Sequence, residues 1–267
     1  MENIVEFGNV IVYYLTRTLK YQILEVFQMD VLIGLYKKEL KLLKNTFIGV
    51  LIATGVIFII GVVAANWSQQ FGLFYFLSFS LFVFHAFYII WFMLQSLQFE
   101  VRYGQWLHNP HSGSMLLLGK LLASSTYFLI SLTLNTIILL ILLPYMIEVV
   151  PVPQVGELLL VILDIVIGSI LLGIFATFLW TVYYSISAPT WVRTIFLLLI
   201  IFSLQVAYNL ILQIPAFSST SVKVMGYTDM FYIRFTPTNP VLMFFYILLT
   251  LIAFFLSAKL LERKVEV

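Results

Sequence analysis

Six continuous apolar runs constrain the fold of this 267-residue chain more than any other feature of its sequence. A hydrocarbon core of about 30 Å requires about 20 residues of helix, and each run is close to that length or longer. Continuous runs indicate helices, because the strands of a transmembrane barrel alternate apolar and polar residues. We therefore predict an all-α integral membrane protein with six transmembrane helices. The expected spans are Phe47–Ala65, Phe71–Leu94, Leu121–Leu143, Leu158–Tyr183, Val192–Leu212 and Val241–Leu261.

The composition excludes a water-soluble fold. Hydrophobic residues make up 62% of the chain and charged residues 10%, whereas about a quarter of the residues of a soluble domain are charged. A net charge of +2 without a clustered basic face argues against a nucleic-acid partner. The chain has no cysteine, which excludes disulfides, thiolate nucleophiles and cysteine-ligated metals.

The distribution of basic residues predicts the orientation. Of the 14 Lys and Arg residues, all but Lys223 and Arg234 lie in the N-terminal segment, near the second and fourth loops, or in the C-terminal tail. Cytoplasmic loops carry the excess of Lys and Arg in membrane proteins. Both termini are therefore expected in the cytoplasm, with the chain multi-pass in the cell (plasma) membrane.

Residues 1–46 form an expected cytoplasmic, interfacial N-terminal segment, and residues 47–267 the six-helix transmembrane domain. Within the first segment, Leu35–Asn45 has apolar residues on one helical face and lysines on the other, which is typical of an amphipathic helix lying in the membrane interface. Either this helix anchors the chain on anionic lipid, or it also contacts a cytoplasmic partner. The apolar positions are Tyr36, Leu40, Leu43 and Phe47, and the basic ones are Lys37, Lys38, Lys41 and Lys44.

The segment Gln213–Pro240, before the last expected span, is too apolar for a freely solvated loop. Irregular backbone at membrane depth must pack on protein or line water. We therefore expect short interfacial or re-entrant helices here.

Catalytic motifs are missing. A zinc protease needs His-Glu-x-x-His, whereas His108 and His111 are three residues apart with a proline between them. No paired aspartates for Mg²⁺ and no Gly-x-Ser-x-Gly turn occur. We therefore predict no enzyme activity, no metal site and no cofactor on this chain.

The run from Gly113 to Leu121 is a near match to a phosphate-binding loop. Its glycines are one residue too far apart, and Leu121 replaces the hydroxyl residue that would bind Mg²⁺. The sequence instead indicates a helix capped by Ser112 or Ser114, with Lys120 extending its amine to the membrane interface.

Polar residues within the spans are candidates for function, because burying them in lipid is unfavourable. Asp164 is either a structural residue near the outer interface or part of substrate passage or proton coupling, and His85 is either a buried hydrogen-bonding residue or a site. Gln205, Asn209 and Gln213 share one helical face, which either binds a neighbouring helix or lines a path at a subunit interface.

A pattern follows the second span. Glu100 is followed by a Leu-x-x-Pro turn at Leu107–Pro110 and by Gly-Lys-Leu at 119–121. This resembles the membrane subunits of type-2 ABC transporters. The resemblance runs from about Leu35 and includes the basic helix, the six spans, the very short first outer connection and the bulky outer segment before the last span. The chain departs from the family pattern in residues 1–34 and at Gly113, where an arginine often follows the proline turn.

The resemblance implies a permease that works as a dimer with a second copy or homologue, beside a separate ATP-binding-cassette ATPase subunit that binds ATP and Mg. The second and fifth spans would line the path, with Ser78, Gln205, Asn209 and Gln213 as candidate residues. The Tyr36–Lys44 helix would assist the ATPase contact. The expected coupling residues are Glu100, Arg102, Gln105, Trp106, Leu107, His108 and Pro110.

The function expected is export of an apolar or amphipathic cargo: a peptide, drug, lipid or lipid-linked sugar. The alternatives are a membrane enzyme acting on lipid, and an accessory or immunity protein that binds a membrane-active peptide. An ATPase gene beside this one would favour the permease, and an isolated gene would favour the other two.

Overall fold

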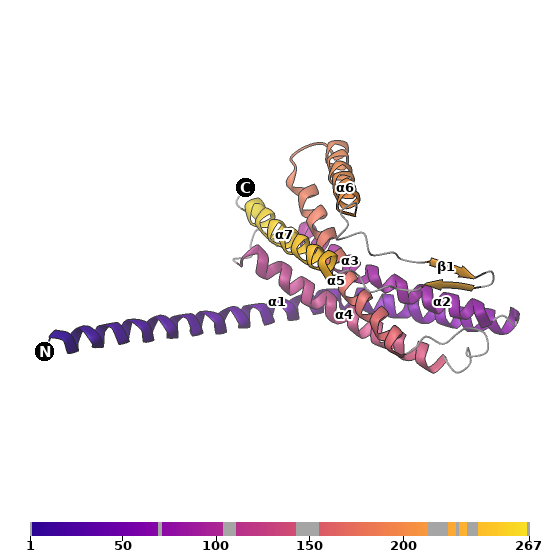
Figure 1. Ribbon diagram of the computed structural model, residues 1–267, viewed down its shortest axis with the longest axis horizontal. Coiled ribbons are helices and arrows are strands. Elements are labelled where there is room, and N and C mark those ends of the chain that lie inside the picture. Colours follow the sequence, from indigo (N-terminus) through magenta and orange to yellow (C-terminus); the bar gives the residue numbers. More distant parts are fainter. Residues whose placement is uncertain are drawn as a thin grey trace.

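The computed structural model describes residues 2–68, 71–103, 111–142, 155–212, 224–227, 230–233 and 240–265 (Figure 1). These residues are helical except for one small pair of strands and the few that border helices. The helices are α1 (Glu2–Ser68), α2 (Phe71–Phe84), the short 3-10 helix η1 (His85–Phe87), α3 (Tyr88–Tyr103), α4 (Gly113–Leu142), α5 (Val155–Ser185), α6 (Thr190–Leu212) and α7 (Pro240–Val265). The strands are β1 (Val224–Tyr227) and β2 (Met230–Ile233).

Five helical segments among the described residues are long and apolar enough to cross a membrane, which fits a multi-pass membrane protein. They are Met29–Ser68, Ser80–Arg102, Gly113–Ile141, Ile162–Ser185 and Phe244–Glu262. The expected span Val192–Leu212 falls in α6, whose side chains are described only as far as Val206; that apolar part, Thr190–Val206, is shorter than a span. The sixth span is therefore not confirmed.

The expected interfacial helix is not confirmed as a separate element. The backbone of α1 is helical without interruption from Glu2 to Ser68, so Leu35–Asn45 continues directly into the first span (Figure 1). Its apolar face packs on protein rather than on lipid alone: Leu43 and Phe47 are buried in a cluster with Phe92 of α3 and Ala123 of α4.

The segment Gln213–Pro240 contains strands where helices were expected. In its described part, β1 pairs antiparallel with β2, from Val224 opposite Ile233 to Tyr227 opposite Met230. Valine, isoleucine and aromatic residues favour strands over helices, which explains the difference.

The centre of the bundle lies where α3, α4 and α5 meet. Ile89, Met93 and Phe128 are almost fully buried in one cluster, against which residues of α5 pack. A Cβ at Gly173 of α5 would lie 2.5 Å from Ile89 Cγ2, so only glycine permits this approach. The small-residue face of Ser169, Gly173 and Thr177 thus packs between helices.

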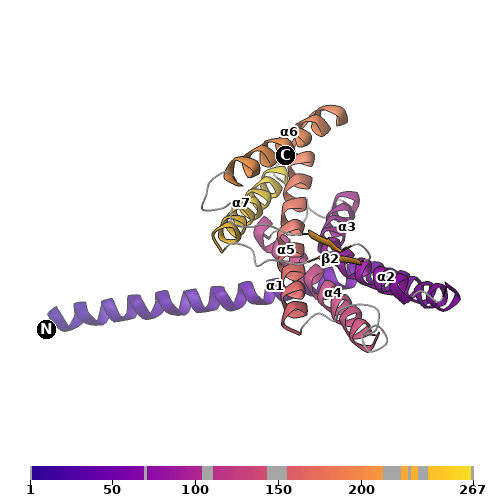
Figure 2. The same cartoon turned by 45° about the vertical axis from the view of Figure 1, so that its right-hand side comes forward.

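Helix α6 lies apart from the rest of the bundle. It is on the far side of α5 and α7 from α1, and both views show the same arrangement (Figures 1 and 2). Most of its large apolar side chains up to Val206 are exposed in the single chain.

Candidate functional site

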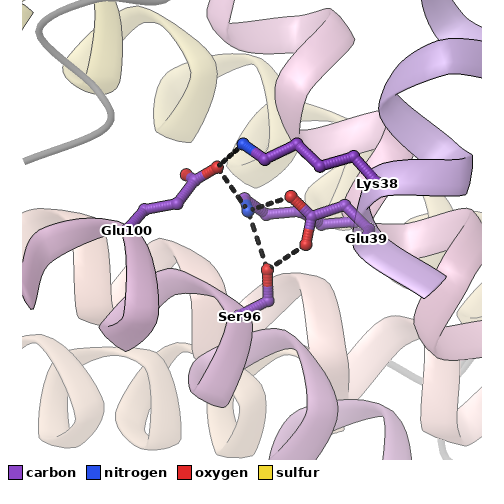
Figure 3. A network of polar contacts seen from close by, with 5 residues as sticks. Lys38, Glu39, Ser96 and Glu100 are labelled. Atoms are coloured by element: carbon purple, nitrogen blue, oxygen red, sulfur yellow. Dashed lines mark hydrogen bonds and ion pairs between the residues drawn. The ribbon is translucent and has the colours of Figure 1, made fainter. Parts of the chain in front are cut away.

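A buried network of charged groups joins α1, α3 and α4 (Figure 3). Its centre is Lys120 of α4, whose side chain is fully buried. The Lys120 amine lies 2.8 Å from Glu39 Oε1 of α1, 3.0 Å from Glu100 Oε1 of α3 and 2.7 Å from the Ser96 hydroxyl of α3. An ammonium group has three N–H donors, so this arrangement gives each of them an acceptor.

The carboxylates of this network have further donors. The Ser96 hydroxyl donates to Glu39 Oε2 at 2.5 Å, while Lys38 of α1 donates to Glu100 Oε1 at 3.3 Å. The Lys38 side chain is 38% exposed, whereas that of Glu100 is 2% exposed. Glu100 Oε2 has no hydrogen-bond partner among the described residues. The two lysines and two glutamates balance in charge, which burial requires.

Local helix geometry explains how the network assembles. Ser96 and Glu100 are four residues apart on α3 and therefore share a face. Glu39 is four residues from both Leu35 and Leu43, which are buried. Glu39 thus lies on the packed face of α1, while Lys37, Lys41 and Lys44 are exposed. Removing Lys120 would leave the buried carboxylate of Glu39 without an opposite charge and that of Glu100 with only the partly exposed Lys38, so Lys120 ties the three helices together.

The prediction that Lys120 reaches the membrane interface is wrong. Lys120 lies between Leu117 and Ala123, both 0% exposed, so its amine points into the bundle, where two carboxylates compensate its charge. Glu39 was not predicted as a site residue. The sequence signal for it was its four-residue spacing from Leu35 and from Leu43, which places it on the same helical face as these two apolar residues.

A second contact fixes the start of α4. The Gly113 N–H donates to Glu262 Oε1 of α7 at 2.9 Å, so an acidic side chain satisfies one of the free amides at this helix start. A Cβ at Gly113 would lie 2.4 Å from the Ala258 carbonyl oxygen. This approach of α7 explains why glycine stands at position 113. The helix begins directly after Ser112, in keeping with the predicted start.

The predicted coupling residues run along the sequence from Glu100 to Pro110, just before the contact at Gly113. Glu100 is buried in the network and Arg102 is exposed, both on α3. Gln105, Trp106, Leu107, His108 and Pro110 lie outside the described residues. Contact with a partner subunit stays a prediction. The structure adds that the carboxylate of Glu100 faces other helices of this chain.

His85 is a buried hydrogen-bonding residue. Its Nδ1 lies 2.7 Å from the Leu81 carbonyl oxygen, and its Nε2 lies 3.0 Å from the Ser131 hydroxyl of α4. A carbonyl only accepts, so Nδ1 carries the proton and, in the neutral ring, Nε2 accepts from Ser131. The ring also stacks on Tyr88, with centroids 4.3 Å apart.

The other intramembrane candidates are not brought together. Ser78 of α2 is fully buried, and its hydroxyl has no hydrogen-bond partner among the described residues. Gln205 is exposed on α6 and Asp164 is exposed near the start of the α5 span. The side chain of Asn209 and all of Gln213 lie outside the described part, so the shared amide face stays a prediction.

In the described ranges, no group of three or more His, Asp or Glu side chains could hold a metal ion. Comparisons with protein-family models, with characterised proteins and with solved structures find no match to this chain.

Proposed function

We propose that this chain is the permease subunit of an ATP-driven exporter that moves an apolar or amphipathic cargo across the cell membrane. One observation carries the proposal furthest. The stretch 104–110, which resembles an ATPase-coupling loop, is preceded by Glu100 and followed by Gly113, and each is bonded to other helices. A force on this stretch would therefore reach α1 and α4 through Glu100 and α7 through Gly113.

The coupling follows from that connectivity. An ATPase subunit binds ATP and Mg, docks on residues 104–110 and closes on its partner copy. The buried ion pairs resist separation of α1, α3 and α4, because pulling one charge away leaves its partner uncompensated. These helices then move as a unit relative to a second permease copy or homologue.

The proposed topology has six spans, with α6 as the fifth. Five spans would place the two termini on opposite sides of the membrane, whereas the lysine and arginine distribution favours both in the cytoplasm. A span at α6 resolves this conflict. The exposed amide of Gln205 then faces the second copy or a water-filled path rather than lipid.

The proposal is tested by purifying the tagged chain from its native membrane in mild detergent and identifying the proteins that accompany it. We expect an ATP-binding-cassette ATPase in stoichiometric amount and ATP hydrolysis in the preparation. Changing Trp106 and Leu107 to aspartate should remove both. The matched control is Trp67→Asp, because Trp67 is 89% exposed and lies at the C-terminal end of α1, far along that helix from Glu39.

Retention of the ATPase by Trp67→Asp and its loss from the Trp106 and Leu107 variant would support the permease assignment. A folded wild-type chain that carries no ATPase from its native membrane would overturn it.

A further inference from the structure

A buried polar side chain on α4 has no hydrogen-bond partner among the residues the structure describes. Asn135 of α4 is 1% exposed, and neither its Nδ2 nor its Oδ1 has a hydrogen-bond partner within the described ranges. A buried group left without a hydrogen bond costs about 1–3 kcal/mol, and most buried polar groups bond to protein or to ordered water. Asn135 carries two such groups in one side chain.

The neighbours of Asn135 place it against α2. Leu132, three residues earlier, shares a packed cluster with Phe82 of α2, and Ile138, three residues later, packs on the cluster that contains Leu81. Ser131, one turn before Asn135, bonds to His85, the first residue of η1 after α2. Residues three and four apart share a helical face, so Asn135 lies on the face of α4 that contacts α2.

The Ser78 hydroxyl is a second buried group without a hydrogen-bond partner among the described residues, and it lies at a similar level along the helix axes. Ser78 precedes His85 by seven residues, which is two turns of the same face, and its buried hydroxyl also has no partner within the described ranges. At about 1.5 Å per residue, Asn135 lies about 6 Å and Ser78 about 10 Å beyond the level of the His85–Ser131 bond. The difference in height, about 4 Å, is short enough for water to bridge the two helices.

The helix next to this position is also irregular. The α-helical pattern changes to 3-10 over His85–Phe87, between α2 and α3. The His85 carbonyl accepts from the Ser169 hydroxyl of α5 at 3.4 Å, and the Ser131 hydroxyl that donates to His85 keeps lone pairs for a further donor. A buried water needs two to four polar partners. On one side of Asn135 these are its amide and the Ser131 hydroxyl, and on the other side its amide and the Ser78 hydroxyl, so each hydroxyl requires its own water.

We propose that ordered water binds between α2 and α4 at Asn135, bridging its amide to the hydroxyls of Ser131 and Ser78. Water donates to Asn135 Oδ1 and accepts from Nδ2, so it satisfies both groups of the amide. The contact between α2 and α4 is then dry and apolar at Leu132 and Phe82 and hydrated one turn further along. This inference does not depend on the transport assignment, because it concerns the interior of one chain.

The test is millisecond X-ray radiolysis of the purified full-length chain in lipid nanodiscs made with ¹⁸O-labelled water. Bound water activated in place oxidises the side chains beside it. We expect ¹⁸O incorporation at Phe82, which is 1% exposed and packs beside Leu132, and none at Phe92, which is 0% exposed and lies away from Asn135. Labelling of Phe82 no higher than that of Phe92 would overturn the proposal without any variant.

Two variants locate the water. Asn135→Leu should abolish labelling of Phe82, and Ser78→Ala should reduce it. Thr136→Val is the matched control, because the Thr136 hydroxyl bonds to the Leu132 carbonyl of its own helix and Thr136 is the next residue along. Equal labelling in wild type and Asn135→Leu would place the water elsewhere and contradict the assignment to Asn135.

Discussion

The two halves of α4 each bury a polar side chain, but they treat it differently. In the N-terminal half, Lys120 has three partners, one on α1 and two on α3. In the C-terminal half, Asn135 is almost equally buried and has no partner within the described ranges. Side chains hold α4 to its neighbours at Lys120 and, through the Ser131–His85 bond, at Ser131, whereas we propose that water does so at Asn135. Equal burial thus does not mean equal rigidity.

The difference matters because buried charges and buried amides respond differently when the helices around them move. A lysine cannot remain charged in an apolar site without an acid beside it, so the first half of α4 tolerates little separation from α1 and α3. An amide can exchange one water for another as the helices shift, so the second half can adjust.

The largest effect is expected from Lys120→Met. This change leaves the carboxylates of Glu39 and Glu100 buried with only the half-exposed Lys38 near one of them. Breaking a buried ion pair by removing one partner costs about 3–5 kcal/mol. Unfolding of the purified protein in detergent should show a loss of that size, and Lys37→Met, at an exposed lysine, should show almost none.

Adding Glu39→Gln to the Lys120 variant should restore part of the lost stability, because it removes one of the uncompensated charges. Equal stability of the single and double variants would contradict an electrostatic origin of the effect.

Gly113→Ala probes the same half of α4 without changing a charge. Its methyl group would lie 2.4 Å from the Ala258 carbonyl oxygen, so α4 and α7 must separate and the bond to Glu262 weakens. Overpacking of this kind costs about 1–3 kcal/mol. In Gly55→Ala of α1 the new methyl meets nothing within 4 Å, so that variant should be neutral or more stable in the same unfolding measurement.

Ser131→Ala tests the second half of α4 at its bond to His85. It removes the donor to His85 Nε2, a hydrogen bond whose net contribution is about 1 kcal/mol. We expect a loss of that order in unfolding experiments. Thr133→Ala, two residues away at an exposed position, serves as the control, and similar losses in both variants would mean that the His85 bond contributes nothing specific.

The smallest effect is expected from Lys38→Gln. Lys38 is 38% exposed, and Glu100 keeps its contact with Lys120 when Lys38 is neutral. Partly exposed ion pairs contribute less than about 1 kcal/mol because water screens them. The ratio of the Lys120 effect to the Lys38 effect, measured in one detergent, therefore reports how far burial strengthens the network. Comparable losses would show that the two lysines are equivalent and that burial is irrelevant.

The sequence was sufficient to predict the positions of most spans, because about 20 consecutive apolar residues have few alternatives to a membrane helix. It also predicted a helix that begins at Ser112 or Ser114, and α4 begins directly after Ser112. Local patterns could not reveal that Lys120 and Glu39 meet, since they are 81 positions apart. A lysine at a helix end fits either an interface or an ion pair, and only the placement of neighbouring helices decides between them.

The same limit applies to Leu35–Asn45 and to the strands at 224–233. The apolar face of the first segment suits lipid or protein equally well, and the structure places it on α3 and α4. The apolar character of the second predicted burial but not its form, and the antiparallel pairing of β1 and β2 was missed because periodicity is weak over four residues.

The distance along the chain between Glu39 and Lys120 has a consequence for biosynthesis. The ribosome adds about 5–20 residues per second, so the 81 positions between them correspond to about 4–16 seconds. During that interval α1 exists with an acidic residue on its packing face and no lysine opposite it. The nascent first helix must therefore keep Glu39 in contact with water or with the insertion machinery until α4 has been synthesised.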